Sequence, residues 1–218
     1  MNKNILKEIH DHVLKIATPK RAESNKWFFK TGIGQYGEGD TFIGLTVPET
    51  RQIAKSFKEI PLNIAEKLLK SEFHEERLLA LFILIDKFSK GDKKLREDIF
   101  NLYFKSIKYI NNWDLVDASC TKIVGEFVKE KYSLKSKNCS GVKFLVSLAS
   151  DKNIFAKNKK EKLWEKRIAI VSTFAFMFKP FKNEYAPNIV FEVVKKNLNE
   201  KRGKVNNTHR KEMLGGKC

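Results

Sequence analysis

The chain has 218 residues, with 43 Lys or Arg against 26 Asp or Glu, so its formal net charge is +17. A hydrophobic content of 42% argues against intrinsic disorder and is enough for a proper core. The longest apolar run, residues 78–85, is too short to span a membrane, and residues 1–16 lack the apolar centre of a secretory signal. Three cysteines without CxxC spacing argue against a disulfide scaffold. We therefore expect a cytoplasmic protein with no membrane partner.

The positive charge is spread along the chain rather than confined to one tail, as the lysine pairs Lys93–Lys94 and Lys195–Lys196 illustrate. A basic surface distributed over a folded body favours a protein that follows the nucleic-acid backbone over a membrane-anchored tail. Two alternatives remain open. The partner could be an acidic protein, or the charge could reflect a generally lysine-rich composition without functional meaning.

Helical periodicity runs through nearly every segment. The pair Thr18–Pro19 is typical of a helix start, and Pro48 and Pro61 each open a further helix. The Gly-rich segment (residues 31–44) cannot form a stable helix, and we expect a turn or a β-hairpin there. The other predicted helices cover residues 5–16, 18–30, 74–88, 94–109, 113–131, 142–149, 161–178 and 188–198.

Successive helices with short connections predict an all-α fold of antiparallel helix pairs. The pairs begin at intervals of roughly 30 to 50 residues, which is the range of helical solenoids such as HEAT repeats. A solenoid has a concave face, which suits a basic groove. An ordinary globular bundle of helices remains the alternative. In either case we expect one domain over residues 1–218.

The most informative stretch is NNWDLVDASC at residues 111–120. Asn112 can cap the helix and Asp114 suits its positive end, so both have structural explanations. Trp113 and Asp117 are four residues apart and project together, with Asp117 on the flank of the predicted buried stripe. A carboxylate beside an apolar stripe is costly unless it is paired or used. A buried salt bridge and a functional role are therefore equal alternatives for Asp117.

A second candidate lies in LWEKRIAIVSTF at residues 163–174. The predicted inward stripe of this helix consists of Leu163, Ile170, Val171 and Phe174, and Arg167 falls on it. A guanidinium there is either the partner of an acid such as Asp117 or a ligand of a phosphate at a groove.

Other candidate sites are weaker. The Gly-rich segment lacks the GxxxxGK[ST] pattern of a phosphate loop, and the four histidines lack metal-ligand spacing, so no metal site is expected. Cys120 is interpreted as a small core residue. Trp27 and Phe28 could face DNA, but core packing is the favoured interpretation.

Residues 112–117 (NWDLVD) and 166–174 (KRIAIVSTF) resemble two signature stretches of the AlkD-like DNA alkylation repair glycosylases. The sequences FKTG, QYGEGD, FIG and VP in residues 29–48 resemble the N-terminal signature of many members. The resemblance runs from residue 3 to residue 180. It implies HEAT-like repeats that hold duplex DNA on a concave basic surface, and removal of cationic 3-alkyl and 7-alkyl purines without full base flipping.

The same resemblance assigns roles to three residues. Trp113 matches an active-site tryptophan, Asp117 matches the essential aspartate, and Arg167 matches a DNA-contacting arginine. No cofactor is implied, the partner is duplex DNA with alkylated purines, and we expect a monomer.

The C-terminal residues depart from the family pattern. Members usually carry a second active-site tryptophan there, whereas residues 208–218 read THRKEMLGGKC. We therefore expect residues 201–218 to be atypical, truncated or mobile, the apolar face around Val193 to be poorly covered, and excision to be weakened rather than abolished. The alternatives are a non-catalytic relative that binds structured DNA, or a helical-repeat scaffold.

Overall fold

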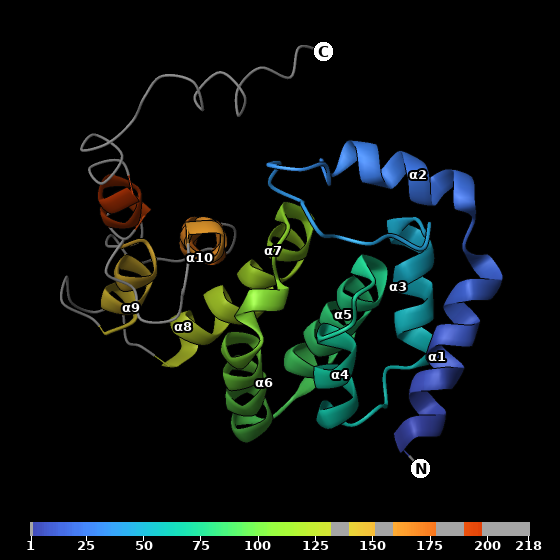
Figure 1. Ribbon diagram of the computed structural model, residues 1–218. Coiled ribbons are helices and arrows are strands. Elements are labelled where there is room, and N and C mark those ends of the chain that lie inside the picture. The colour runs from blue at the N-terminus through green and yellow to red at the C-terminus, as the bar shows by residue number, and fades with distance from the viewer. Residues whose placement is uncertain (1, 132–139, 151–158, 178–189, 198–218) are drawn as a thin grey trace.

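The computed structural model describes residues 2–131, 140–150, 159–177 and 190–197, which form the all-α fold predicted from the sequence (Figure 1). Among these residues the only β pairing is an isolated bridge between Thr41 and Phe73. None of the described helices is both long and apolar enough to cross a membrane. The named helices are α1 (Asn2–Ile16), α2 (Pro19–Phe28), α3 (Val47–Ser56), α4 (Leu62–Leu69), α5 (His74–Lys90), α6 (Lys93–Lys105), α7 (Trp113–Cys120), α8 (Glu126–Lys131), α9 (Ser140–Leu148) and α10 (Lys159–Ser172), with 3-10 turns at Ile107–Tyr109 and Thr173–Phe176.

Side-chain caps set several of the helix starts. Thr46 and Glu49 form a capping box at α3, in which the Glu49 carboxylate accepts a hydrogen bond from the Thr46 amide at 2.8 Å. Asp92 caps α6 by accepting a hydrogen bond from a backbone amide of its first turn. Pro19 is the first residue of α2, as predicted.

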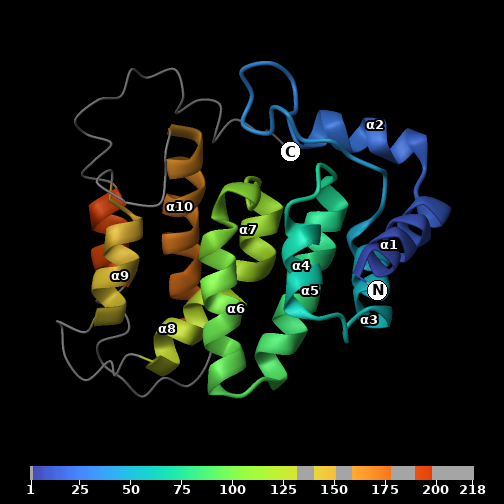
Figure 2. The ribbon, with the colours of Figure 1, turned by 60° about the horizontal axis from the view of Figure 1, so that its bottom comes forward.

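The helices lie side by side, from α1 and α3 at one end to α9 at the other (Figures 1 and 2). Helix α5 lies within this row and packs against α3, α4, α6 and α7. Every residue from 74 to 84 is buried, which is typical of a helix surrounded by its neighbours. The start of α5 is therefore buried, and its polar side chains contact the neighbouring elements.

Helix α2 lies across one side of this row, and the Gly-rich segment leads from it toward the start of α7 (Figures 1 and 2). Helix α2 has no buried residue, and its Trp27 and Phe28 are 74% and 54% exposed. The interpretation of these two rings as core residues is therefore wrong. A polar side chain ties α2 to its neighbours instead, because the Arg21 guanidinium donates to the Ile16 carbonyl at 3.2 Å and to the Glu49 carboxylate at 2.5 Å.

The helix predicted over residues 113–131 is interrupted. A π-helical turn, Thr121–Gly125, separates α7 from α8. The Thr121 hydroxyl donates to the Val171 carbonyl at 2.9 Å, and a Cβ placed on Gly125 would lie 2.5 Å from the Ser172 carbonyl oxygen. The π turn therefore lies against the last residues of α10, and such turns are frequent at functional sites.

Residues 190–197 are helical, within the range predicted. Val193 is fully buried in the hydrophobic core, so the expectation that it is poorly covered is wrong. The atypical residues 201–218 lie outside the described part of the chain.

Candidate functional site

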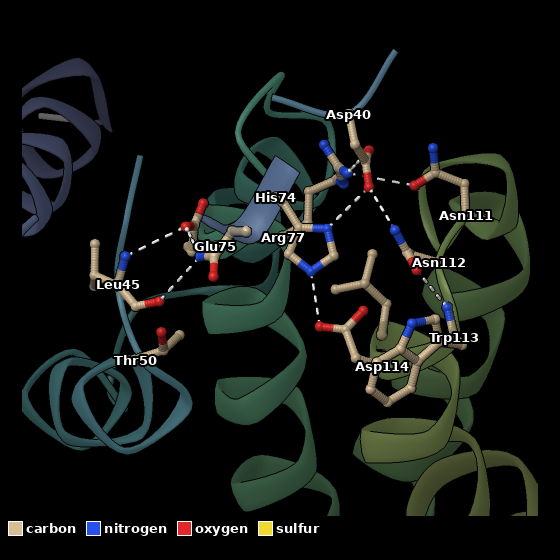
Figure 3. Close-up of polar contacts among 12 residues, drawn as sticks. Asp40, Leu45, Thr50, His74, Glu75, Arg77, Asn111, Asn112, Trp113 and Asp114 are labelled. Carbon is tan, nitrogen blue, oxygen red and sulfur yellow. Dashed lines mark hydrogen bonds and ion pairs between the residues drawn. The ribbon is translucent and has the colours of Figure 1, made fainter. Parts of the chain in front are cut away.

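Trp113 is the first residue of α7, and its position is set by the helix cap. The Asn112 side-chain oxygen accepts a hydrogen bond from the Trp113 amide at 2.8 Å, as the sequence predicts for an N-cap (Figure 3). The half-buried indole stacks on Phe29, with ring centres 5.5 Å apart, and meets Phe28 edge-on at 5.9 Å. Part of the ring therefore remains open to a ligand, while two aromatic side chains hold the rest of it.

A buried network of charged side chains lies behind Trp113 (Figure 3). His74, at the start of α5, binds Asp40 through Nδ1 at 3.0 Å and Asp114 through Nε2 at 2.7 Å. Asp40 also accepts hydrogen bonds from the Arg77 guanidinium and, at 2.9 Å, from the Asn112 side-chain amide. The network thus joins the Gly-rich segment, α5 and the first turn of α7.

The contacts within this network shift the pKa values of His74 and Asp40. Burial would lower the pKa of His74, but the hydrogen bonds and negative charges of Asp114 and Asp40 outweigh it and raise the pKa to about 9. Burial would raise the pKa of Asp40, but His74 and Arg77 outweigh it and lower that pKa to about 2. At neutral pH an imidazolium therefore lies between two carboxylates and donates a hydrogen bond to each.

A second buried acid anchors the far end of the Gly-rich segment. The Glu75 carboxylate accepts hydrogen bonds from the backbone amides of Ile43 at 3.0 Å, Gly44 at 2.9 Å and Leu45 at 3.3 Å. It also accepts one from the Asn25 side chain at 3.3 Å. Because a carboxylate held by several amides is a strong acceptor, this contact fixes where the segment returns to α3.

Asp117 lies one helical turn after Trp113 and forms an ion pair with Arg167. The guanidinium donates from Nε to Oδ1 at 2.8 Å and from Nη2 to Oδ2 at 2.6 Å. Of the two alternatives predicted for Arg167, the free protein shows the pairing with Asp117. The two side chains are 35% and 42% exposed, so the pair is not buried. This hydrogen bonding, partly offset by burial, raises the pKa of Arg167.

The buried stripe of α10 differs from the predicted one. Leu163 and, in the following 3-10 turn, Phe174 are 39% and 40% exposed, so they do not face the core. Ile170 and Val171, also predicted, are partly buried against it. The buried side chains are those of Trp164, Glu165, Ile168, Ala169 and Ser172. The sequence of this helix contains two neighbouring apolar stripes, and the one that is buried is not the predicted one. Arg167 lies at the edge of the buried stripe and is partly exposed to solvent.

Cys120 is a buried core residue, as predicted, and burial raises the pKa of its thiol to about 12. It is therefore not a nucleophile at neutral pH. Within the described ranges, no three His, Cys, Asp or Glu side chains gather closely enough to hold a metal ion.

The structure thus brings the three predicted site residues together on α7 and α10. Trp113 offers an aromatic face, Asp117 an exposed carboxylate, and Arg167 holds that carboxylate with two of its donors. Asp40 and His74 are not predicted from the sequence as site residues. They bind Asn112 and Asp114, respectively, at the start of α7. The unusual polar run HEER at residues 74–77, directly before a long apolar stretch, is the one signal that could have indicated them.

A family model described as DNA alkylation repair enzyme matches residues 9–208 of the chain. The matched range includes Trp113, Asp117 and Arg167, together with the residues of the buried network. No curated protein and no solved structure matches the chain significantly.

Proposed function

The chain belongs to the DNA alkylation repair enzyme family, and from this premise we propose that it is a DNA glycosylase. It excises cationic 3-alkyl and 7-alkyl purines from duplex DNA by hydrolysing the N-glycosidic bond. Trp113 and Asp117 are its catalytic residues, and Arg167 contacts the DNA. No cofactor is needed for this chemistry.

The chemistry of alkylated purines explains these residue types. Alkylation at N3 or N7 places a positive charge on the purine, so the base leaves as a neutral molecule without a general acid. The enzyme then has to stabilise an oxocarbenium-like sugar, and a carboxylate does so by its charge while it orients water at the anomeric carbon. An indole face attracts the cationic base by about 0.5 to 2 kcal/mol.

The observation that carries the proposal is the exposed, bidentate carboxylate of Asp117, one turn from the open part of Trp113. A carboxylate that acts on DNA has to be reachable from solvent and fixed in orientation. Arg167 provides that orientation through Nε and Nη2, which leaves the donors on Nη1 for a DNA phosphate.

The proposed binding surface is the concave face of a HEAT-like solenoid lined with basic residues. Two observations support it: the helices succeed one another side by side, and the net charge of +17 is distributed along the chain. On this proposal the chain acts as a cytoplasmic monomer of one domain. Its contacts with phosphates hold the duplex without reading the sequence.

The direct test is the release of free 3-methyladenine or 7-methylguanine from alkylated duplex DNA by the purified chain. We expect release of both bases and no release from undamaged DNA. Undetectable release together with normal duplex binding would overturn the glycosylase proposal.

A second candidate is a non-catalytic relative that binds structured DNA. It is favoured by the same ion pair, because the charge of Asp117 is neutralised by Arg167 in the free protein. A glycosylase has to keep that negative charge effective toward the sugar. Tighter binding to branched DNA than to linear duplex, without base release, would support this candidate.

A further inference from the structure

Three large apolar side chains are exposed where α2 ends and the Gly-rich segment begins. Trp27 and Phe28 are 74% and 54% exposed, and Ile33 is 97% exposed. Single exposed hydrophobic residues are common, whereas several close together beside a candidate site indicate a contact surface. The Lys30 ammonium lies 4.4 Å from the centre of the Trp27 ring. Apolar surface beside a positive charge suits a nucleic acid, which presents flat base faces together with phosphates.

The turn after α2 sends Phe28 and Phe29 in different directions. The Phe29 amide donates to the Asn25 carbonyl at 2.8 Å, and Lys30 then has the left-handed φ of 53°, which is uncommon for a residue other than glycine. Phe29 is half-buried and stacks on Phe42, with ring centres 5.0 Å apart. Phe28, the last residue of α2, remains on the exposed side. The turn therefore separates a supporting ring from an exposed one.

The Gly-rich segment folds back on this turn and holds it in place. The Gly37 amide donates to the Lys30 carbonyl at 3.0 Å, and the Asp40 amide donates to the Gly37 carbonyl at 3.0 Å. The segment therefore forms consecutive turns, which confirms one of the two predicted alternatives and excludes the hairpin. Asp40 is 7% exposed and is bound by His74 and by Asn112, the residue that caps α7. Buried polar contacts thus connect the end of α2 to the start of α7.

Phe28 contacts Trp113 without being enclosed by it. The two rings meet edge-on, with centres 5.9 Å apart and planes at 61°, and Phe28 also meets Phe29 edge-on at 5.1 Å. These contacts hold the Phe28 ring in one orientation while more than half of the residue remains exposed. Trp113 is half-buried. Phe28 and Trp113 thus form an aromatic corner, and each of them keeps surface that a ligand can reach.

We propose that Phe28 is a specificity-determining residue of the candidate site, whose ring recognises the positive charge of an alkylated purine. This inference rests on the proposed glycosylase function. The face of an aromatic ring attracts a cation that lies within about 6 Å of the ring centre. A purine placed in the aromatic corner lies within this distance of both rings, because their centres are 5.9 Å apart. An unmodified purine has no charge and gains only apolar contact from Phe28, so the ring favours alkylated purines.

The charged half of the site does not supply this selectivity by itself. In the free protein the Asp117 carboxylate accepts two hydrogen bonds from Arg167, so its attraction for a cationic base is offset by the guanidinium. An aromatic ring is neutral and attracts a cation without a counterion. The aromatic corner therefore provides recognition of the charged base that does not depend on the state of the ion pair.

The test compares the affinity for two duplexes that differ only in the charge of one base. One contains 2′-fluoro-7-methylguanosine, whose glycosidic bond resists hydrolysis because fluorine disfavours the sugar cation, and the other contains 2′-fluoroguanosine. The wild-type chain should bind the charged duplex more tightly. Phe28→Leu keeps an apolar side chain without an aromatic face, and it should lower this preference by about three- to tenfold. Phe28→Tyr keeps the ring and should retain the preference.

Trp27→Leu is the matched control, because Trp27 lies on the same helix, is more exposed and has Lys30 over its ring. It should leave the preference for the charged duplex unchanged. Equal wild-type affinity for the two duplexes, an unchanged preference in Phe28→Leu, or an equal loss in Trp27→Leu would each overturn the inference. So would a wild-type dimer in sedimentation that Phe28→Leu dissociates, since the exposed side chains would then form an interface between two copies.

The outcome is separate from that of the proposed function, because no base is released from the fluorinated duplex. A chain that releases no base from ordinary alkylated DNA would refute the glycosylase proposal. The affinities of wild type, Phe28→Leu and Trp27→Leu for the two duplexes would still decide whether Phe28 recognises the charge. Thermal denaturation of each variant checks that it is folded during the titrations.

Discussion

The Asp117 carboxylate and the Arg167 guanidinium form a bidentate ion pair that links α7 to α10, with N–O distances of 2.8 and 2.6 Å. The two side chains are 35% and 42% exposed, so water screens the pair and its contribution to stability is small. Its geometry is nevertheless well defined, because a guanidinium fork fits a carboxylate in one plane. We therefore interpret the pair as a device that orients Asp117 rather than one that holds the fold together.

Asp117→Asn tests this interpretation, since it keeps the shape of the side chain and removes its charge. Base release should fall by orders of magnitude, because stabilisation of the developing sugar cation depends on that charge. The free energy of unfolding should change by less than about 1 kcal/mol, as for other exposed pairs. Duplex affinity should persist. Single-turnover excision, thermal denaturation and binding titration give the three values.

Asp86→Asn is the matched control for this variant. Asp86 is 40% exposed and forms an ion pair with Lys90 on α5. The Asp86→Asn variant therefore loses a comparable ion pair on a helix that does not carry Asp117. It should release base at the wild-type rate. Full activity in Asp117→Asn would exclude Asp117 as a catalytic residue, and a loss of several kcal/mol would show that the pair is structural.

Arg167→Gln tests the proposed phosphate contact. Duplex affinity should fall, and the slope of log affinity against log salt should become smaller by about one unit, because one fewer phosphate is neutralised. Arg96→Gln provides the comparison, since Arg96 pairs with Glu130 between α6 and α8. An unchanged salt slope in Arg167→Gln would contradict a direct contact between Arg167 and a phosphate.

The His74 network predicts a specific dependence of stability on pH. The folded pKa of His74, about 9, lies above its ordinary value of 6.5, so the charged imidazolium is stabilised by folding. This contribution is complete below pH 6.5 and is lost as the pH rises through 9. It amounts to at most about 3.5 kcal/mol, since one pKa unit corresponds to about 1.4 kcal/mol.

Denaturant unfolding between pH 6 and pH 10 measures this effect. The wild-type free energy of unfolding should decline across the range, whereas the decline should be largely absent in His74→Gln. His12→Gln replaces an exposed histidine of α1 and should behave like the wild type. A wild-type stability that is constant from pH 6 to pH 10 would be incompatible with a charged His74 between Asp40 and Asp114.

Local chemistry explains which parts of the fold could be predicted from the sequence. The cap at Asn112 and the start of α2 at Pro19 depend on neighbouring residues alone, so the sequence indicated both correctly. For Trp27, the sequence favours core packing over a DNA-facing position. It is exposed because α2 presents no face to the core, which is a property of the tertiary arrangement.

In the candidate site, too, the contacts within one helix could be predicted from the sequence, whereas those between distant segments could not. Trp113 and Asp117 are neighbours on one helix, so their spacing alone brings them together. His74 joins side chains that are 34 and 40 residues away along the chain, at Asp40 and Asp114. No periodicity or spacing rule connects such positions, and therefore this network became visible only in the structure.

The path of the Gly-rich segment gives the last prediction, through two glycines that differ in their surroundings. A Cβ on Gly37 would lie 2.2 Å from the Phe29 carbonyl oxygen and 3.0 Å from that of Lys30, so Gly37→Ala has to displace backbone. A Cβ on Gly34 would meet nothing within 4 Å, although its φ of +77° is strained for any other residue. Gly34→Ala should therefore cost about 1 to 2 kcal/mol of stability and leave base release unchanged.

Gly37→Ala should instead lower base release by at least about tenfold, because a shift of the segment strains the anchor at Asp40, which binds the capping residue Asn112 of α7. Thermal denaturation of both variants, followed by single-turnover excision below their transitions, distinguishes the two effects. If both glycines tolerated alanine with equal base release, the Gly-rich segment would have no part in shaping the site. If Gly34→Ala lost activity as Gly37→Ala does, the exposed turn around Gly34 would itself have to contact the substrate.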